Sequence, residues 1–173
     1  PHGGLTGLVQ GCNVGITDVV LSLEKMDQIE EIDPMGRTMT VQAGVPLQTL
    51  QEYAEAHDLM FPMDLGARGS CQIGGNVSTN AGGNRVIRFG MTRENVLGLE
   101  AVLADGTVVS SMNTMIKNNA GYDLKQLFIG SEGTLGLVTR VVVRLREAPK
   151  ALHTGFAGFE SFNQLTNFLR FID

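Results

Sequence analysis

Residues 61–83 of the chain read FPMDLGARGSCQIGGNVSTNAGG, a run rich in glycine and small polar residues. Residues without bulky side chains let backbone N–H groups approach a polyanion closely. Most of the run shows neither helical nor strand periodicity, and it is several times longer than a hairpin loop of about 2–5 residues. We therefore interpret it as a wall built for a ligand, to which short side chains add hydrogen-bonding groups at Ser70, Asn76, Ser78, Thr79 and Asn80.

Two further glycine clusters lie far from this wall in the sequence, PHGGLTG at residues 1–7 and GSEGTLG at residues 130–136. A tight turn is the alternative for each cluster taken alone, because glycine marks turns more often than it marks phosphate sites. Three clusters in one small domain favour a single extended cofactor. Residues 61–83 hold Ile73 and Val77 but few charges, which argues against disorder.

The composition describes one globular domain. The chain has 173 residues, of which 43% are hydrophobic and 18% charged, and this leaves no room for a second full domain. A net charge of -5 and an aromatic content of 6% argue against nucleic acid as a partner. No apolar run reaches the roughly 18 residues of a membrane span, and no signal peptide opens the chain. We expect a soluble protein.

Two cysteines, Cys12 and Cys71, are too few for a disulfide framework and lack the spacing of a metal site. They are expected to be reduced thiols of an intracellular protein. Cys71 lies in the glycine-rich wall with no histidine near it in the sequence, so a packing role is favoured over a redox or nucleophilic one. The glycosylation pattern Asn76-Val77-Ser78 is discounted because it falls in the same wall.

Apolar patterning predicts a mixed α and β fold with antiparallel pairing in the second half. The sequence Asp105-Gly106 between apolar runs is a strong hairpin signal, and residues 33–36 form a turn. No strand, G-x-G-x-x-G, helix order is present, which argues against a nicotinamide-type doubly wound sheet. The predicted strands are 18–23, 38–43, 96–103, 107–111 and 135–145, and the predicted helices are 46–58 and 122–128.

Both ends indicate a piece of a longer protein. Pro1 is not an initiator methionine, and the chain enters directly into a turn of the phosphate-loop kind. At the other end, a strand is expected over residues 154–160 and an amphipathic helix, capped by Ser161, over residues 161–171. These last elements would begin a following domain.

Four segments, taken together and in order, resemble one known family. They are PHGGLTGL at 1–8, MDLGARGSCQIGGNVSTNAGG at 63–83, VLGLEAVLADGT at 96–107 and GYDLKQLFIGSEGTLGLVT at 121–139. The chain resembles the FAD-binding domain of the vanillyl-alcohol oxidase and p-cresol methylhydroxylase superfamily, most of all its D-2-hydroxyglutarate, D-lactate and glycolate dehydrogenases. The resemblance implies an α+β fold of two subdomains around FAD. Residues 1–149 would form the FAD-binding domain without its first strands, and residues 150–173 would begin the substrate domain.

The resemblance also implies which residues hold FAD. The pyrophosphate would lie at the backbone amides of His2, Gly3, Gly4, Leu5, Thr6 and Gly7, since a glycine turn can bind an anion without Lys or Arg. The flavin and its ribityl chain would be lined by Pro62, Asp64, Gly66, Ser70, Gly74, Gly75, Asn76, Ser78, Thr79, Asn80 and Gly82. The adenosine half would face Glu132, Gly133, Gly136 and Val138.

The first loop departs from the family pattern at Leu5, which occupies a place that is often glycine. The loop would be stiffer there and still compatible with binding. Some members of the superfamily attach the flavin covalently through a histidine within this loop. Here Leu5 and Thr6 follow Gly3-Gly4, so noncovalent FAD is expected, and His2 is expected to pack or to make a hydrogen bond.

The reaction implied by the resemblance is oxidation of a D-2-hydroxy acid to the 2-oxo acid, with hydride transfer to flavin N5 and electrons passed to another acceptor. In these relatives a histidine cluster with a divalent metal and basic carboxylate clamps belong to the domain after residue 173. No catalytic residue and no metal ligand is therefore expected in this chain, and the chain alone is expected to be inactive. The small hydroxy acid would bind through that later domain. The location would be the cytoplasm of a bacterium or a mitochondrion, and an oligomer is possible.

Other polar residues are given structural roles. His57 and His153 are expected to face solvent or to pack, and Lys117 and Tyr122 are treated as structural. Two arginines near the wall, Arg68 and Arg88, either offset phosphate or reduced-flavin charge or are ordinary surface residues.

Two other functions stay open. One is a different FAD-dependent oxidase on the same scaffold, acting on an alditol or an aryl alcohol. Covalent flavin or fast reaction of the reduced flavin with oxygen would favour it. The other is a nucleotide-binding or interaction module without redox activity, which failure to retain any flavin would favour.

Overall fold

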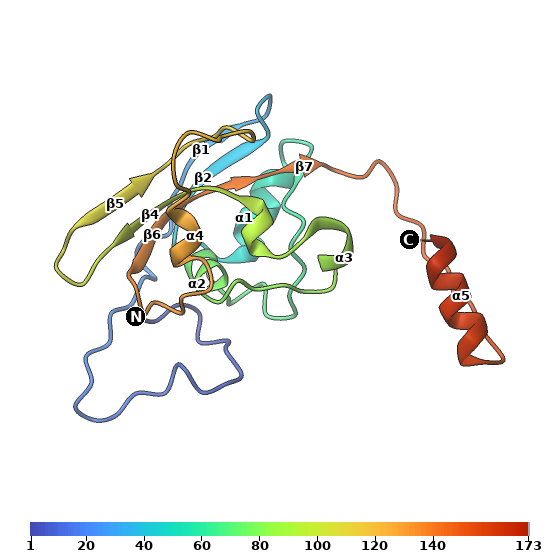
Figure 1. Ribbon diagram of the computed structural model, residues 1–173, viewed down its shortest axis with the longest axis horizontal. Coiled ribbons are helices and arrows are strands. Elements are labelled where there is room, and N and C mark those ends of the chain that lie inside the picture. Colours follow the sequence, from blue (N-terminus) through green and yellow to red (C-terminus); the bar gives the residue numbers. More distant parts are fainter. Residues whose placement is uncertain (173) are drawn as a thin grey trace.

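The computed structural model describes residues 1–172 and is built around a five-stranded antiparallel sheet (Figure 1). The strands lie side by side in the order β1 (Ile29–Asp33), β2 (Thr38–Gln42), β6 (Leu137–Arg144), β4 (Val96–Val102) and β5 (Val108–Ser111). Every neighbouring pair runs antiparallel. The mixed α and β fold with antiparallel pairing is thus confirmed, and the doubly wound alternative is excluded.

The core lies between the sheet and three helices, α1 (Leu47–Glu55), α2 (Ile73–Ser78) and α4 (Lys125–Phe128) (Figure 1). Alternate residues of the central strands point into it, and most of the residues between them are buried as well. Each large aliphatic side chain that is fully buried contributes about 1.5–3 kcal/mol. The core side chains include Met39, Val41, Leu47, Leu50, Ala54, Ile73, Val77, Leu99, Phe128, Val141 and Val143.

Arg140 of β6 crosses the sheet with its guanidinium group. Its Nε donates to the two carboxylate oxygens of Glu30 at 3.0 and 2.9 Å, and a second nitrogen lies 3.5 Å from Oε2 of Glu100 on β4. These contacts raise the pKa of Arg140, chiefly through the hydrogen bonds to Glu30. They also explain why the charged sequence IEEID forms the edge strand β1.

The predicted buried strand at residues 18–23 is wrong, and the first strand is β1. Only Ser22 pairs, in an isolated parallel bridge with His2, and Val19 is 93% exposed. An aliphatic run becomes a buried strand only where another strand pairs with it along its length, and β2 fills that role for β1. The expected strand, strand, helix order is still found. The turn at residues 33–36 is confirmed, with Asp33 Oδ1 accepting from the N–H of Gly36 at 2.9 Å.

The elements predicted from local signals are confirmed with small changes of boundary. The hairpin of β4 and β5 turns at Asp105, whose Oδ1 accepts the N–H of Thr107 at 2.9 Å. This hydrogen bond lowers the pKa of Asp105. The helix predicted over residues 46–58 is α1, the long strand is β6, and the short helix before Gly130 is α4.

The glycine-rich run was expected to be irregular, but it contains the six-residue helix α2. Ile73 and Val77, four residues apart, are both fully buried, and this contact with the sheet holds a helix that glycine by itself disfavours. The short elements α3 (Val86–Phe89), η1 (Thr92–Asn95), β3 (Leu59–Met60) and β7 (Arg146–Glu147) were not predicted. Strands β3 and β7 pair with each other away from the main sheet.

The predicted strand at residues 154–160 is also wrong, because residues 148–161 form neither helix nor strand. The helix after it is confirmed as α5 (Phe162–Ile172), and Ser161 Oγ accepts the N–H of Gln164 at 3.4 Å. Helix α5 stands apart from the sheet (Figure 1) and has no buried residue. Asp173 lies outside the described residues. Over residues 1–172, no helix combines the length and the apolar character that spanning a membrane requires.

Candidate functional site

The loop at residues 1–7 is held by backbone hydrogen bonds at His2, whereas the N–H groups that follow it have no acceptor in the described residues. His2 donates its N–H to the carbonyl of Leu21 at 2.8 Å and accepts the N–H of Leu23 at 3.2 Å. Leu5 has a left-handed backbone with φ of +57°. Among the described residues, none provides a hydrogen-bond acceptor for the N–H groups of residues 3–7. Those donors are available to a ligand or to water.

This loop packs directly on the glycine-rich wall. Gly4 lies so close to residues 70 and 71 that any side chain on it would overlap the carbonyl oxygen of Ser70. Gly4 is therefore required by the contact between two backbones. Gly3 lies against Gln72, since a Cβ on Gly3 would be 3.5 Å from Gln72 Oε1.

The two glycines of α2 have different surroundings. An added Cβ on Gly74 would lie 2.6 Å from Cβ of Ala43, so this glycine lets the helix pack on the end of β2. An added Cβ on Gly75 or Gly66 would meet nothing within 4 Å. These two positions leave space in front of the wall.

The third cluster, residues 130–136, docks on the C-terminal end of α2. The N–H of Gly130 donates to the carbonyl of Val77 at 3.1 Å, and the N–H of Glu132 donates to that of Ser78 at 2.8 Å. Consecutive left-handed residues, Glu132 with φ of +54° and Gly133 with φ of +78°, turn the loop back. Gly133 also lies beside Pro1, so the three clusters meet.

Two adjoining cavities of about 170 and 510 Å³ open between the three clusters and share Gly3, Gly7, Cys12, Gly75 and Thr79. Neither cavity is lined by a Lys or an Arg. Most of the residues expected at the cofactor line one or both of them: His2, Gly3, Gly4, Leu5, Thr6, Gly7, Gly66, Gly74, Gly75, Asn76, Ser78, Thr79, Glu132, Gly133, Gly136 and Val138.

The other expected residues lie behind this surface or beside it. Asp64 lines a separate cavity, and Pro62, Ser70, Asn80 and Gly82 line neither of the two. Asn80 Oδ1 accepts the N–H of Arg93 at 3.0 Å, and Gly82 packs against Val86 and Met91. These residues hold the wall in shape.

Two orphaned polar atoms test the fit of a cofactor. Nε2 of His2 and Oε1 of Gln72 are buried without a hydrogen-bond partner, and the two side chains line the smaller and the larger cavity. A buried polar atom without a partner costs about 1–3 kcal/mol, so a polar ligand would be stabilised there. The free N–H groups of residues 3–7 can bind an anion without a cationic side chain, and these two atoms can add polar contacts, so the residues present fit an extended dinucleotide.

Cys71 lies against this site as a packing residue. It is buried, and its Sγ accepts a hydrogen bond from Nδ2 of Asn76 at 3.6 Å. Burial raises the pKa of the Cys71 thiol, which therefore stays protonated at neutral pH. Cys12 and Cys71 are both free thiols.

The remaining candidates lie away from the two cavities. His57 stacks on Tyr53 with ring centroids 5.0 Å apart, while His153, Lys117 and Tyr122 are exposed. No group of three or more His, Cys, Asp and Glu side chains in residues 1–172 is placed to hold a metal ion.

Sequence reasoning missed two residues that shape the site, Gln72 and Arg93. Gln72 stands inside the quoted run, yet nothing in its type or spacing distinguishes it there. Arg93 lies outside the run. Its guanidinium group donates to the carbonyls of Gln126 and Ile129, and no sequence pattern indicates these contacts. Both residues could be found only from the fold.

Comparison with known proteins gives the same assignment. Residues 1–111 match the protein family described as FAD binding domain. The chain is 52% identical over 165 residues to the mitochondrial D-2-hydroxyglutarate dehydrogenase of Danio rerio, covering 95% of this chain and 31% of that protein. It is 48% identical to a D-2-hydroxyglutarate–pyruvate transhydrogenase of Saccharomyces cerevisiae, covering 94% and 33%. It is 45% identical to the D-2-hydroxyglutarate dehydrogenase of Xanthomonas citri pv. viticola, covering 95% and 35%.

The chain thus spans about a third of the length of these relatives. Among solved structures, two of alkyldihydroxyacetonephosphate synthase superpose with TM-scores of 0.75 and 0.74 at 23% and 22% identity. Each covers 87% of this chain, which covers 27% and 29% of those chains. At this identity the match concerns the fold alone.

Proposed function

Since this chain belongs to the FAD binding domain family, with FAD as its cofactor, we propose that it is the FAD-binding part of a flavin-dependent dehydrogenase that oxidises a D-2-hydroxy acid to the 2-oxo acid. The observation that carries the proposal is the meeting of three glycine clusters around two cavities with free backbone N–H groups. The names of the relatives support the substrate class. Hydroxyglutarate, lactate and glycolate are the candidate substrates.

Each cluster has its own part in holding FAD. The N–H groups of residues 3–7 would bind the pyrophosphate, the wall from Pro62 to Gly82 would follow the flavin and ribityl chain, and residues 132–138 would face the adenosine half. Bound there, FAD supplies the acceptor for a hydride from the carbon that carries the hydroxyl. The residues of this chain bind and orient the cofactor and exclude water from one side of it.

We further propose that FAD is held without a covalent bond. His2 Nε2 is buried in the smaller cavity, and Leu5 and Thr6 occupy the part of the loop after Gly3-Gly4. His2 would then serve as a hydrogen-bonding partner of the cofactor.

We also propose how the cofactor and the substrate are divided between the parts of the complete protein. Residues 1–149 would be FAD-binding domain, residues 150–173 would begin the substrate domain, and the groups that bind the hydroxy acid would lie in the rest of the protein. Reduced flavin would pass its electrons to a separate acceptor. The names of the relatives support a mitochondrial location in a eukaryote, and a bacterial protein would act in the cytoplasm.

The test is the visible spectrum of the complete protein. D- and L-2-hydroxyglutarate, D-lactate and glycolate are added separately without oxygen, and the flavin absorbance is followed. We expect a flavin band that one D-2-hydroxy acid or glycolate bleaches and that L-2-hydroxyglutarate leaves unchanged. A bound flavin that none of these acids bleaches would indicate another flavoenzyme. Absence of flavin from the purified protein would contradict the cofactor assignment.

A further inference from the structure

A third cavity, of about 660 Å³, lies on the other side of residues 64–68 from the cofactor cavities. Along this segment Asp64 and Arg68 line the third cavity, whereas Leu65, Gly66 and Ala67 line the larger cofactor cavity. The isolated bridge between Asp64 and Gly83 closes the wall between them. A ligand in this cavity would therefore be a near neighbour of the cofactor.

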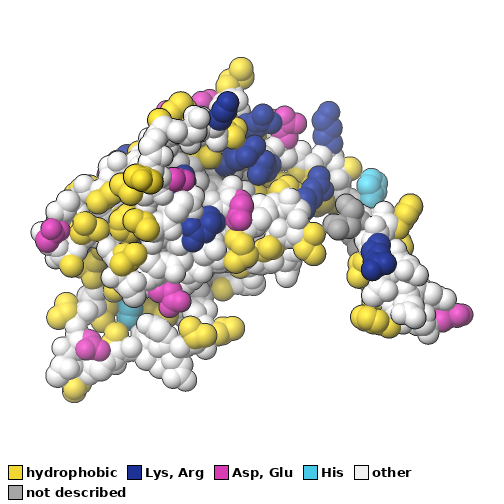
Figure 2. Space-filling model, in the orientation of Figure 1, with side chains coloured by type: hydrophobic (Ala, Val, Ile, Leu, Met, Phe, Trp, Pro, Cys, Tyr) yellow, Lys and Arg dark blue, Asp and Glu magenta, His cyan; other side chains and the backbone are white. Residues whose placement is uncertain are grey.

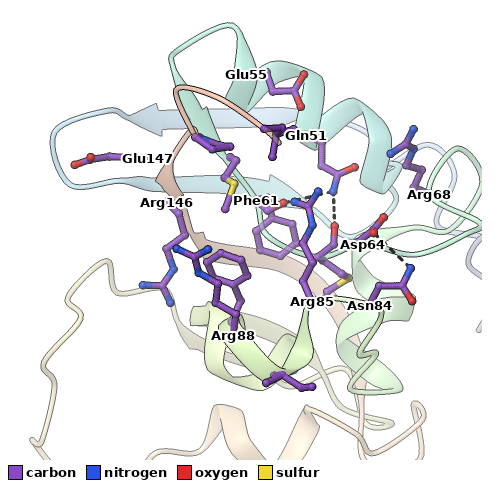
Figure 3. A pocket seen from close by; sticks show the side chains of 16 residues that line it. Gln51, Glu55, Phe61, Asp64, Arg68, Asn84, Arg85, Arg88, Arg146 and Glu147 are labelled. Atoms are coloured by element: carbon purple, nitrogen blue, oxygen red, sulfur yellow. Dashed lines mark hydrogen bonds between the residues drawn. The ribbon is translucent and has the colours of Figure 1, made fainter. Parts of the chain in front are cut away.

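Four arginines from three parts of the chain line this cavity, and we name it the arginine cavity. Arg85 and Arg88 come from the region of α3, Arg146 from β7 and Arg68 from the glycine-rich wall. Figure 3 shows Arg85, Arg88 and Arg146 gathered around Phe61. On the molecular surface, Lys and Arg side chains gather on the side from which the chain leads to α5 (Figure 2).

The four positive charges of the cavity outnumber its three carboxylates, which belong to Glu55, Asp64 and Glu147. Within residues 1–172, the ion pairs involve Arg37, Lys125 and Arg140, and none involves the four arginines of the cavity. Two of the carboxylates that line the cavity already have partners. Glu147 pairs with Arg37 at 3.1 Å, and Asp64 accepts a hydrogen bond from Asn84 at 3.4 Å.

Arg146 carries the clearest sign of an absent partner. Its Nε is buried and has no hydrogen-bond acceptor. Burial, followed by the charges of Arg144 and Arg37, lowers the pKa of Arg146. A partly buried guanidinium group whose Nε–H is unpaired is stabilised by an anion, above all by a carboxylate that can accept two parallel hydrogen bonds.

Apolar side chains form much of the rest of the cavity, beside the polar residues Gln51, Glu55, Asp64, Asn84 and Glu147. Phe61 is only 2% exposed, and Met60, Met63, Ile87, Phe89 and Leu152 add further hydrocarbon surface. Arg88 is held over the ring of Phe89, with its Cζ 5.1 Å from the ring centroid. Cationic groups around an apolar floor fit an organic acid, whose carboxylate and carbon chain need different surroundings. Inorganic phosphate would leave the floor empty.

We propose that the arginine cavity binds a small organic carboxylate through Arg85, Arg88 and Arg146. Its volume falls in the range of small-molecule sites, roughly 300–1,000 Å³. The site lies outside the cofactor cavities and so goes beyond the function proposed above. The carboxylate has two possible sources, the hydroxy-acid substrate itself or a separate organic acid that regulates the enzyme.

Calorimetric titration of the complete, FAD-loaded protein with glutarate tests the site. Glutarate has two carboxylates and no hydroxyl group, so it cannot be oxidised as a hydroxy acid. The double variant R85Q/R88Q should bind it roughly 10–100-fold more weakly than the natural protein. The matched control is Arg170→Gln on α5, which removes an arginine outside the cavity and should leave binding unchanged. The flavin absorbance of each variant checks that the cofactor cavities are intact.

Inhibition kinetics with the same compound separate the two sources. If the cavity holds the substrate carboxylate, glutarate raises the apparent KM of the hydroxy acid and leaves kcat unchanged. If it holds a regulatory acid, glutarate changes kcat. Calorimetry measures glutarate binding without turnover. It therefore tests the carboxylate site even if the proposed reaction is wrong.

Two results would overturn the proposal. One is glutarate binding of equal strength by the natural protein and by R85Q/R88Q. The other is no glutarate binding by the natural protein, as expected if an acidic segment of the complete protein already fills the cavity.

Discussion

The neighbouring residues Gly74 and Gly75 of α2 have different roles. A Cβ on Gly74 would collide with Ala43, just after β2, whereas a Cβ on Gly75 would point into the open space of the cofactor cavities. The sequence shows only a pair of identical residues. Replacing each glycine in turn with alanine, which adds one methyl group, distinguishes a role in packing from a role in binding.

We expect Gly75→Ala to fold normally and to bind FAD at least roughly ten-fold more weakly, since the methyl group takes up space that the cofactor would fill. Gly74→Ala should instead lower the free energy of unfolding by about 1–3 kcal/mol, because the core must shift to accept it. Flavin fluorescence titration measures the first effect and thermal unfolding the second. Equal effects of both variants on FAD affinity would contradict this division.

Leu5 has a left-handed backbone, with φ of +57°. A left-handed backbone costs an L-residue about 1–2 kcal/mol, and glycine avoids that cost while losing more chain entropy on folding. We therefore expect Leu5→Gly to leave the protein as stable as before or to stabilise it by up to about 1 kcal/mol. Leu8→Gly, the same change at a residue whose φ is not positive, should not stabilise. Denaturant unfolding gives the free energy of unfolding of both variants. A clear loss of stability in Leu5→Gly would contradict the prediction.

Among the elements, the loop at residues 130–136 depends on a distant contact for its position. Arg93, in η1, donates to the carbonyls of Gln126 and Ile129, while its backbone N–H donates to Asn80 Oδ1. This residue connects α4 and the loop that follows it to the end of α2. The loop can line the smaller cofactor cavity because both of its flanks are anchored.

Replacing Arg93 with Gln should lower the free energy of unfolding by about 1.5–3 kcal/mol, since hydrogen bonds of a charged donor are lost and two carbonyls lose a partner. FAD affinity should fall with it. Arg37→Gln is the matched control, because Arg37 is 48% exposed in its pair with Glu147 and such a pair contributes at most about 1 kcal/mol. Denaturant titration and FAD fluorescence measure both quantities. A loss in Arg93→Gln no larger than that in Arg37→Gln would show that the anchor is unimportant.

At the scale of the whole molecule, the region from residue 150 onward adds nothing to the core. Helix α5 has no buried residue, and Phe162, Leu169 and Phe171 on it are 75%, 49% and 85% exposed. The core cluster lies entirely within residues 39–145. The sheet with its helices and the C-terminal helix therefore have separate stabilities.

We expect a chain ending at residue 149 to unfold at the same temperature as residues 1–173, within about 2 °C, because no buried apolar surface is removed. It should also associate less, since exposed phenylalanines promote association. Circular dichroism on heating and size-exclusion chromatography of the two chains provide the measurements. A markedly lower unfolding temperature for the shorter chain would mean that α5 packs on the sheet in solution.

The sequence by itself determined the elements that depend on local signals. The Val-rich run at residues 135–145 predicted β6, Pro46 and the apolar spacing after it predicted α1, and Asp105-Gly106 predicted the hairpin. The order of its glycine motifs also indicated the FAD-binding family. These signals are readable because side-chain periodicity and turn chemistry act over a few neighbouring residues.

Only the tertiary structure decided which apolar runs find a partner and which glycines face a ligand. Residues 18–23 and 154–160 have the composition of strands but form none over their length, while the charged run of β1 does, because β2 and Arg140 lie beside it. Gly74 and Gly75 differ in their neighbours alone, and the four arginines of the arginine cavity come from three separate parts of the chain. These features are strand pairing, close backbone contact and clustered charge. Each depends on residues far apart in the chain, so no local sequence pattern can indicate it.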